Sequence, residues 1–546
     1  IEFFGRNKVR VGAGYSLMKL SLLTAKKGLA GLELYYDNET ESKLFDFYEF
    51  DYRKKEDVVR AISEQCSKIQ ASIKLETGPL VKIAVFETID AKVMMFCIHH
   101  LAVDGVSWRI LAEDFKNAVE QIRRKEEVKL PEKTASFIEW SNLLEEYSNR
   151  LSEKEKLYWE QIDARIIYAK INNASAKEDK DCSVVDSKVR YVSQLDFSKE
   201  FTEKILKQAS SICGAKVNEV LLSGIARTIG QMTGQEKIAI NLESHGREKL
   251  HKTIDIDRTV GWFTNIYPVI LDCTQDIRHS VIGAKEAVRS VPNGGIGYGC
   301  HMTSKERNQS DISFNYLGEL DEVGTQENYN CGDNFATENA TDDLILINGM
   351  TSHGKMQFII VSQDERFDQN FIDDFTNCFE KAMKEIIEYC SESSQVEKTA
   401  SDYELYDISV DEFEYLQNEF EGEVNKIYEL TPLQEGMLFH NVVDTSSTAY
   451  VLQTVLNIDT EMESERVKQA LHLLSLRYEV LRTAIIYENV VEPKQVIYQE
   501  REPEFHVLDF STFSVEDKKQ ALDDLIQEDV IRGFHLQSDC ERRRTV

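Results

Sequence analysis

An apolar strand that ends in two histidines and leads directly into an amphipathic helix is the feature that most constrains this chain. The run Val93–Ile98 predicts a buried strand, and Trp108–Arg123 predicts a helix with its apolar side chains on one face. Between them lies His99–Gly105 (HHLAVDG), and Ser107 is the predicted N-cap. Similar strands and helices alternate up to residue 390, which predicts a mixed α/β fold.

The adjacent histidines at this strand end are candidates for chemistry. Neighbouring strand residues point to opposite faces, so His99 and His100 cannot easily share one metal ion. We expect one of them to pack inward and the other to face a site, because strand ends often present catalytic groups. Two ordinary half-buried histidines are the alternative that the residues alone leave open.

A second candidate is a carboxylate at the end of another predicted strand. In Lys237–Glu243, every second residue is apolar, so Ile238, Ile240 and Leu242 share one face. Glu243 ends the strand on its more polar face, and the segment 244–248 follows it. The residues alone are also compatible with a charged strand exit that has no catalytic role.

Charge and cysteine content limit the classes of partner. The 546 residues contain 64 Lys and Arg against 95 Asp and Glu, a net charge of −31. Nucleic acids and anionic membranes attract basic patches, so we expect neither as a partner. The ten cysteines are scattered without a CxxC pair, which is typical of a reducing cytoplasm. The sequence has no apolar run of about 18 residues, the length needed to span a membrane.

The motifs together resemble a known superfamily. The pattern HHxxxDG followed by Val106–Leu111 (VSWRIL) resembles the condensation and epimerization domains of nonribosomal peptide synthetases, in the form typical of epimerization. Glu243–Glu248 (ESHGRE) is similar to the EGHGRE motif of epimerization domains, with Ser244 in place of glycine. Three further segments resemble motifs of these domains in the family's order: Arg258–Val269, Pro292–Gly299 and Phe314–Gly318.

The resemblance implies roles for individual residues. His100 and Glu243 correspond to the family's catalytic histidine and glutamate, and the resemblance leaves open which is acid and which is base. The positions implied as supporting residues are Asp104, Asp114, Arg247, Asn315 and Tyr316. For Asp114, Asn315 and Tyr316, a purely structural hydrogen-bonding role is the alternative.

The resemblance also implies an activity and its partners. The activity is L-to-D epimerization of the α-carbon of an aminoacyl or peptidyl thioester. The substrate is carried on the 4′-phosphopantetheine arm of an upstream peptidyl carrier domain, beside the remaining synthetase modules. No cofactor or metal is expected to bind the chain directly. The alternatives are a condensation domain that forms peptide bonds and a non-catalytic fragment that only docks carrier domains.

The implied architecture has several parts. Residues 1–390 are expected to form a V-shaped epimerization domain of two chloramphenicol-acetyltransferase-like lobes, about 1–170 and 171–390. His100 comes from the first lobe and Glu243 from the second. We expect this domain to be N-terminally truncated, because the family's PIQxWF motif is absent.

A second unit is expected after a linker at 391–426. Leu430–His440 and Arg477–Thr483 resemble the first motifs of a condensation domain, and a helix is predicted at Val467–Leu474. Residues 427–546 should therefore be the N-terminal part of such a domain, a partial third lobe. Without a second HHxxxDG, it should lack a complete active site.

Overall fold

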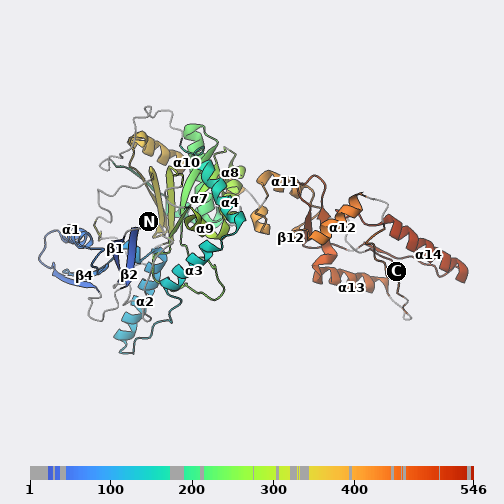
Figure 1. Cartoon of the computed structure of the whole chain (residues 1–546), viewed down its shortest axis with the longest axis horizontal. Coiled ribbons are helices and arrows are strands. Elements are labelled where there is room, and N and C mark those ends of the chain that lie inside the picture. Colours follow the sequence, from blue (N-terminus) through green and yellow to red (C-terminus); the bar gives the residue numbers. More distant parts are fainter. Residues whose placement is uncertain are drawn as a thin grey trace. The chain divides into compact units, whose positions relative to one another are not determined.

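The computed structural model divides the chain into two compact units, Ile1–Glu397 and Lys398–Val546 (Figure 1). The structure describes residues 23–28, 31–36, 45–171, 190–209, 214–274, 276–302, 307–319, 329, 331–332, 343–392, 396–406, 408–443, 448–456, 458, 463–502, 504–537 and 543–545. The predicted N-terminal truncation concerns residues that lie mostly outside this described part.

The N-terminal lobe of the first unit is built on a three-stranded sheet. β3 (Asp46–Asp51) runs parallel to β4 (Val81–Glu87), which pairs antiparallel with β5 (Lys92–Ile98). Helix α1 (Val58–Ala71) packs on one face of this sheet. The buried side chains in this contact are Ile62, Cys66, Ile69, Ala84, Phe86, Met95 and Cys97. The predicted strand at 93–98 is confirmed as β5, but it is buried on one face only, because Met94 and Phe96 are exposed.

Other segments of the first lobe complete the described part. A hairpin pairs β1 (Leu23–Gly28) with β2 (Gly31–Tyr36). Three helices follow the histidine motif: α2 (Gly105–Arg123), α3 (Phe137–Asn149) and α4 (Glu153–Ile166). Trp140 and Leu143 of α3 form a small core with Phe263, a residue of the second lobe. Buried contacts therefore connect the two lobes.

The second lobe holds a six-stranded sheet in the order β6-β11-β10-β9-β7-β8. β7 is parallel to β9 and β9 to β10, whereas the other neighbours pair antiparallel. The strands are β6 (Tyr191–Asp196), β7 (Lys237–Ser244), β8 (Asn265–Asp272), β9 (Ile312–Glu319), β10 (Ile345–Ser352) and β11 (Lys355–Ser362). Alternation along each strand sends one set of side chains to each face of the sheet.

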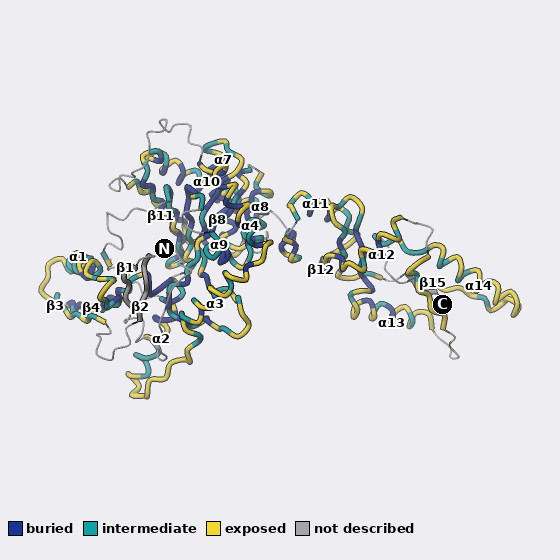
Figure 2. The backbone as a smooth tube through the Cα atoms, in the orientation of Figure 1, coloured by how far each residue is buried: buried dark blue, intermediate teal, exposed yellow. Residues whose placement is uncertain are grey.

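Helices bury one face of this sheet (Figures 1 and 2). Ile238, Ile240 and Leu242 of β7 share a single core with apolar residues of the long helices α7 (Val217–Thr233) and α10 (Gln369–Glu392). Gly224 lets these helices approach, because a Cβ there would lie 2.6 Å from the Met383 Sδ. Apolar residues at helical spacing, among them Phe375, Phe379 and Met383, form the buried face of α10.

Shorter elements complete this lobe. Their bounds are α5 (Lys199–Lys204), η3 (Ile205–Ala209), α8 (Ile277–Arg289), η4 (Pro292–Gly295), α9 (Ile296–His301) and η6 (Glu365–Phe367). The glycine-rich segment Pro292–Gly299 forms η4 and most of α9, and it packs tightly. At Gly295, φ is +83° and a Cβ would lie 2.0 Å from the Tyr267 ring, so only glycine fits.

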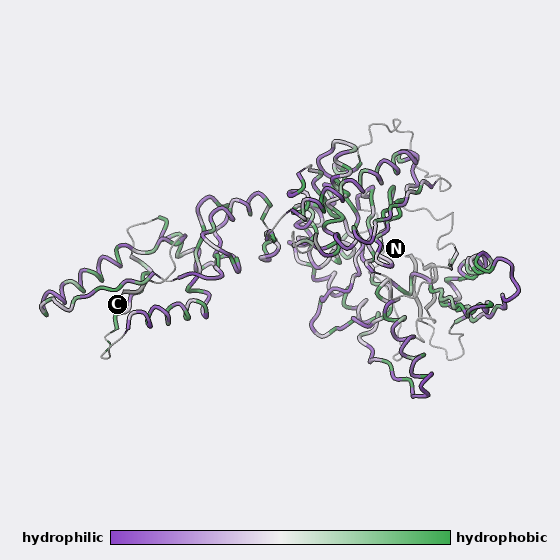
Figure 3. The backbone as a smooth tube through the Cα atoms, turned by 180° about the vertical axis from the view of Figure 1, so that it is seen from behind, coloured by the Kyte–Doolittle hydropathy of each residue, from purple (hydrophilic) through white to green (hydrophobic). Residues whose placement is uncertain are grey.

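The second unit has its own small core around a three-stranded sheet. In this sheet β14 (Lys494–Tyr498) lies between β12 (Val424–Glu429) and β13 (Thr483–Ile486). The other elements are η7 (Ala400–Tyr403), α11 (Val410–Asn418), α12 (Pro432–Val443), α13 (Ser464–Arg477), η8 (Glu479–Arg482), β15 (Glu504–His506), α14 (Val515–Arg532) and β16 (Arg543–Thr545). The long helices alternate between hydrophilic and hydrophobic residues (Figure 3), and α13 contains the predicted helix at 467–474.

Part of the segment predicted as a linker is folded into this core. Phe413 and Leu416 of α11 pack with Val424 and Ile427 of β12. Residues 391–400 are largely polar, which is typical of a linker. The apolar residues after position 404 instead pack into the core of the second unit, against residues that only the fold brings near. Within the described residues, every helix is too short or too polar to cross a bilayer.

Arg482, in the motif Arg477–Thr483 of the second unit, has a structural role. Its side chain is buried, and its guanidinium donates hydrogen bonds to the backbone carbonyls of Ser475, Leu476 and Tyr498 at 2.6, 3.0 and 2.8 Å. The arginine thus joins the end of α13 to β14. A planar group with several donors suits this role better than a lysine.

Candidate active site

The two histidines take different positions where β5 ends. His99 caps the short helix η2 (His100–Ala102), and its Nδ1 accepts a hydrogen bond from the Leu101 amide at 3.2 Å. Burial lowers the pKa of His99, and the neighbouring His100 lowers it further. His100 is exposed and meets the Trp262 ring edge-on, with ring centroids 5.7 Å apart. As predicted, the two side chains differ in burial: His99 is partly buried and His100 is exposed.

Asp104 starts the helix that follows. Its carboxylate accepts a hydrogen bond from the Ser107 amide at 2.7 Å, so Asp104 is the N-cap and α2 begins at Gly105. The predicted N-cap, Ser107, was therefore wrong. Both residues suit a cap, but the chain already leaves the extended conformation after Asp104, and Ser107 lies inside the first turn.

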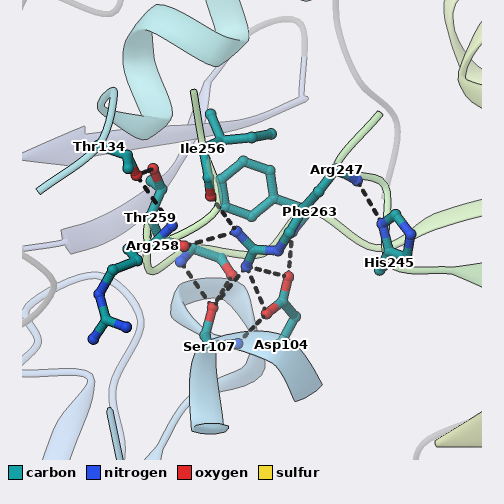
Figure 4. Close-up of polar contacts among 10 residues, drawn as sticks. Asp104, Ser107, Thr134, His245, Arg247, Ile256, Arg258, Thr259 and Phe263 are labelled. Atoms are coloured by element: carbon teal, nitrogen blue, oxygen red, sulfur yellow. Dashed lines mark hydrogen bonds and ion pairs between the residues drawn. The ribbon is translucent and has the colours of Figure 1, made fainter. Parts of the chain in front are cut away.

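Arg247 binds Asp104 from the other lobe (Figure 4). The Arg247 Nη2 donates to both Asp104 carboxylate oxygens at 2.9 Å, and these side chains are only 5% and 4% exposed. The Phe263 amide donates to the same carboxylate at 3.1 Å. The guanidinium also stacks over the Phe263 ring, 3.9 Å from its centroid.

The remaining bonds of this cluster join the lobes further. The Arg247 Nη1 donates to the carbonyls of Ile256 and Thr259 at 3.2 and 2.8 Å. Ser107 Oγ accepts from Arg247 Nη2 at 3.1 Å and donates to the Gly261 carbonyl at 2.9 Å. Burial is the largest effect on Arg247 and lowers its pKa. Asp104 and Arg247 thus bind each other and the loops that follow β5 and β7.

Asp114 has a related role further along α2. Arg258 donates to the Asp114 carboxylate at 2.6 Å and to Glu113 at 2.9 Å. Arg109 of the same helix donates to the Leu317 and Glu319 carbonyls at 3.3 and 3.2 Å, at the end of β9. These contacts support the structural alternative for Asp114.

Glu243 lies near the end of β7 on the face that the long helices leave uncovered. The Asn315 Nδ2 donates to its Oε2 at 2.7 Å from the neighbouring strand β9. Burial is the largest effect on the pKa of Glu243 and raises it; His100 lowers this pKa, and the Asp343 carboxylate raises it. Glu243 belongs to the second lobe and His100 to the first, and the effect on the pKa of Glu243 indicates that the two side chains influence each other electrostatically. Asn241 links this group to Asp343 through a 3.2 Å hydrogen bond.

Tyr316 is placed differently from its neighbour Asn315. Its hydroxyl bonds to Thr351 Oγ1 at 2.8 Å, and its ring stacks near Phe358 in the helix-covered core. Successive strand residues point to opposite faces, so Asn315 faces Glu243 and Tyr316 does not. The structure does not bring the predicted supporting residue Tyr316 to the carboxylate.

The departure from the family motif at Ser244 leaves the local backbone regular. Ser244 continues the strand and pairs with Asn265 in β8, an extended conformation that any residue can adopt. Glycine is strictly required at position 246 instead, because Gly246 has φ +62° and a Cβ there would lie 1.8 Å from the Phe263 carbonyl oxygen. Serine at 244 is therefore tolerated.

Trp262, Asp343 and Asn241 belong to the site but were not predicted as functional residues. Trp262 stands within a quoted motif, and Asn241 shares the polar face of Glu243, so both carried a weak signal. Asp343 lies about a hundred residues from Glu243 in the sequence, and only the sheet order brings it near. In the described part of the chain, no group of three His, Cys, Asp or Glu residues is arranged to hold a metal ion.

Comparison with known proteins identifies the family. Residues 33–408 and 424–542 match the model of the condensation domain. The chain belongs to the condensation-domain family. Bacitracin synthase 3 of Bacillus licheniformis is 32% identical over 524 residues, which are 93% of this chain and 8% of that protein. Gramicidin S synthase 1 of Brevibacillus brevis is 34% identical, over 68% of this chain and 36% of that protein. The chain thus spans only a minor part of these relatives.

Solved structures agree with this family. The epimerization domain from the third module of tyrocidine synthetase B is similar with a TM-score of 0.61 and 29% identity, over 68% of this chain and 86% of that one. The condensation domain of Monacolin K polyketide synthase is similar in fold, with a TM-score of 0.54 and 12% identity over 69% and 87%. These likenesses confirm the predicted mixed α/β fold of two chloramphenicol-acetyltransferase-like lobes.

Proposed function

We propose that the first unit is an epimerization domain that inverts the α-carbon of an aminoacyl or peptidyl thioester. The observation that carries this proposal is the partly buried Glu243 carboxylate, which Asn315 holds on one lobe and which His100 of the other lobe influences electrostatically. Inversion requires a proton to leave one face of the α-carbon and another to arrive on the opposite face. Two titratable groups from separate lobes supply that requirement.

The chemistry follows from the environment of Glu243. Burial raises its pKa, which makes the carboxylate a stronger base than an exposed glutamate. The carboxylate takes the α-proton, and the C–H electron pair passes into the thioester carbonyl as an enolate. A proton returned to the opposite face gives the other enantiomer with no net change in composition. The Asn315 amide keeps the carboxylate oriented.

His100 has two compatible roles. It is exposed at the end of β5, where its ring contacts Trp262, so it can approach a substrate between the lobes. As the partner acid, it would return the proton to the α-carbon. As a cation, it would stabilise the negative charge that develops on the enolate oxygen. A pH profile of the variant His100→Ala would separate these roles.

The substrate and partners follow from the relatives. Those compared above are peptide synthases that this chain matches only in part. We propose that an upstream peptidyl carrier domain brings the thioester on its 4′-phosphopantetheine arm and that the chain works in the cytoplasm beside other synthetase modules. The second unit, which matches the family over 424–542, is proposed as the N-terminal part of a condensation domain.

The nearest rival is peptide-bond formation by a condensation domain, since the family model that matches the chain is that of the condensation domain. A carrier domain loaded with an L-aminoacyl or L-peptidyl thioester is incubated with the full chain, alone and together with a second carrier domain that holds an acceptor L-aminoacyl thioester, and the released product is analysed for chirality and length. Epimerization gives D-product of unchanged length. Elongated product with retained configuration would refute the proposal in favour of condensation, and unchanged L-thioester would favour a docking fragment.

A further inference from the structure

Glu243 is one member of a row of side chains that crosses the six-stranded sheet. Glu243 pairs with Ile266 of β8, and its carboxylate is bonded to Asn315 of β9. Asn315 pairs with Asn348 of β10, which pairs with Ile359 of β11, and Ile359 pairs with Gln194 of β6. The row therefore reads Ile266, Glu243, Asn315, Asn348, Ile359 and Gln194.

This row lies on the sheet face that α7 and α10 do not cover. The residues before Asn315, Asn348 and Ile359 in their strands, which are Phe314, Ile347 and Phe358, belong to the helix-covered core. Alternation then points the row to the opposite side. Asn348 and Gln194 are exposed, and Ile266 and Ile359 are 45% and 40% exposed. Two apolar side chains and two carboxamides thus remain open to solvent along the row that contains the carboxylate.

The chemistry of the row favours a peptide. A carboxamide offers both a donor and an acceptor, which matches the N–H and C=O groups of a peptide backbone. The row beyond Glu243 is uncharged, although the chain carries a net charge of −31. Exposed apolar residues at Ile359 and Ile266 would be covered by a ligand lying over them.

The spacing indicates which peptide residue reaches Asn348. Neighbouring strands lie about 4.8 Å apart, so Asn348, two strands from Glu243, is about 10 Å away along the row. An extended peptide advances about 3.4 Å per residue. A substrate whose α-carbon lies at Glu243 would therefore bring its second or third upstream residue to Asn348.

We propose that this row is a binding site for the upstream residues of a peptidyl thioester, with the Asn348 carboxamide hydrogen-bonded to the peptide backbone. The inference rests on the proposed function, because it places the reacting α-carbon at Glu243. It narrows the substrate class from aminoacyl or peptidyl thioesters to peptidyl thioesters with at least two upstream residues.

Two unreactive probes test this site in the full chain. They are the N-acetylphenylalanyl and the N-acetyltriglycyl-phenylalanyl amides of aminopantetheine, which are both uncharged at the peptide end and differ by three glycine residues, and their affinities are measured by calorimetry. The longer probe should bind about three- to tenfold more tightly, the effect of one or two hydrogen bonds. Asn348→Ala and the similarly sized Asn348→Leu should both abolish this difference. Asn377→Ala, at an exposed position on α10, should preserve it.

The outcomes separate the two proposals. Equal affinities of the probes, no binding of the longer probe, or an unchanged ratio in Asn348→Ala would each overturn the peptide site. Retained selectivity in Asn348→Leu would show that bulk and not hydrogen bonding is responsible, which also overturns the assigned role. Because the probes do not react, loss of epimerization with intact length selectivity would count against the proposed function alone.

Discussion

The buried ion pair between Arg247 and Asp104 allows the effect of one substitution on stability to be worked out. In Arg247→Met, Asp104 would lose its charged partner and keep only the amides of Ser107 and Phe263. Two carbonyls and the Ser107 hydroxyl would lose a donor as well. Removing one partner of a buried pair typically costs about 3–5 kcal/mol, and we expect a loss in that range.

Urea unfolding measured by tryptophan fluorescence checks this value, because all four tryptophans lie in the first unit. Arg60→Met is the control: Arg60 pairs with Glu64 at 2.9 Å on an exposed face, and its loss should cost about 0.5 kcal/mol or less. If Arg247→Met lost less than about 1 kcal/mol, the pair would not hold the lobes together as described.

Three further predictions concern packing and the carboxylate. Gly295→Ala should destabilise the first unit by at least about 2 kcal/mol in urea unfolding, because its Cβ would clash with the Tyr267 ring. Gly283→Ala is the control: it lies within α8 with open space at its Cβ and should stabilise the unit by up to about 1 kcal/mol. Equal effects of the two substitutions would contradict the close contact of Gly295 with Tyr267. Asn315→Asp adds a like charge beside Glu243, so the acidic limb of the pH profile of α-proton exchange should move to higher pH; an unmoved limb would exclude Glu243 as the base. Burial raises the pKa of Glu243 above its unfolded value of about 4.3, so its carboxyl contributes stability at low pH that is lost as the pH rises. The unfolding free energy of Glu243→Gln relative to the natural chain should therefore increase from pH 4 to pH 7, and a decrease would contradict the raised pKa.

The local hydrophobic pattern of the sequence predicted the two strands that carry the candidate catalytic residues. The apolar run before His99 and the alternation before Glu243 are short-range signals, and both appear as the strands β5 and β7. The order of motifs then identified the superfamily, which supplied the pairing of His100 with Glu243 that periodicity alone could not.

The long-range contacts could not be predicted in the same way. Asp343 reaches the site only through the order β10-β9-β7, and Tyr316 leaves it because β9 continues its alternation beyond Asn315. The helix start at Gly105 was not predicted because Asp104 and Ser107, three positions apart, are both good N-cap residues. The contacts of Asp104 with Arg247 and Phe263 could not be predicted from the local sequence, because both partners lie more than 140 residues away.

Solvent exchange at the α-carbon tests the central claim most directly. The full chain is incubated in D₂O with an aminoacyl and a tetrapeptidyl thioester on a phosphopantetheinylated carrier domain, and deuterium in the recovered acyl group is measured by mass spectrometry. Glu243→Gln should reduce the exchange rate at least about 100-fold, whereas Glu388→Gln, an exposed glutamate on α10, should leave it unchanged. Undiminished exchange in Glu243→Gln would contradict the account.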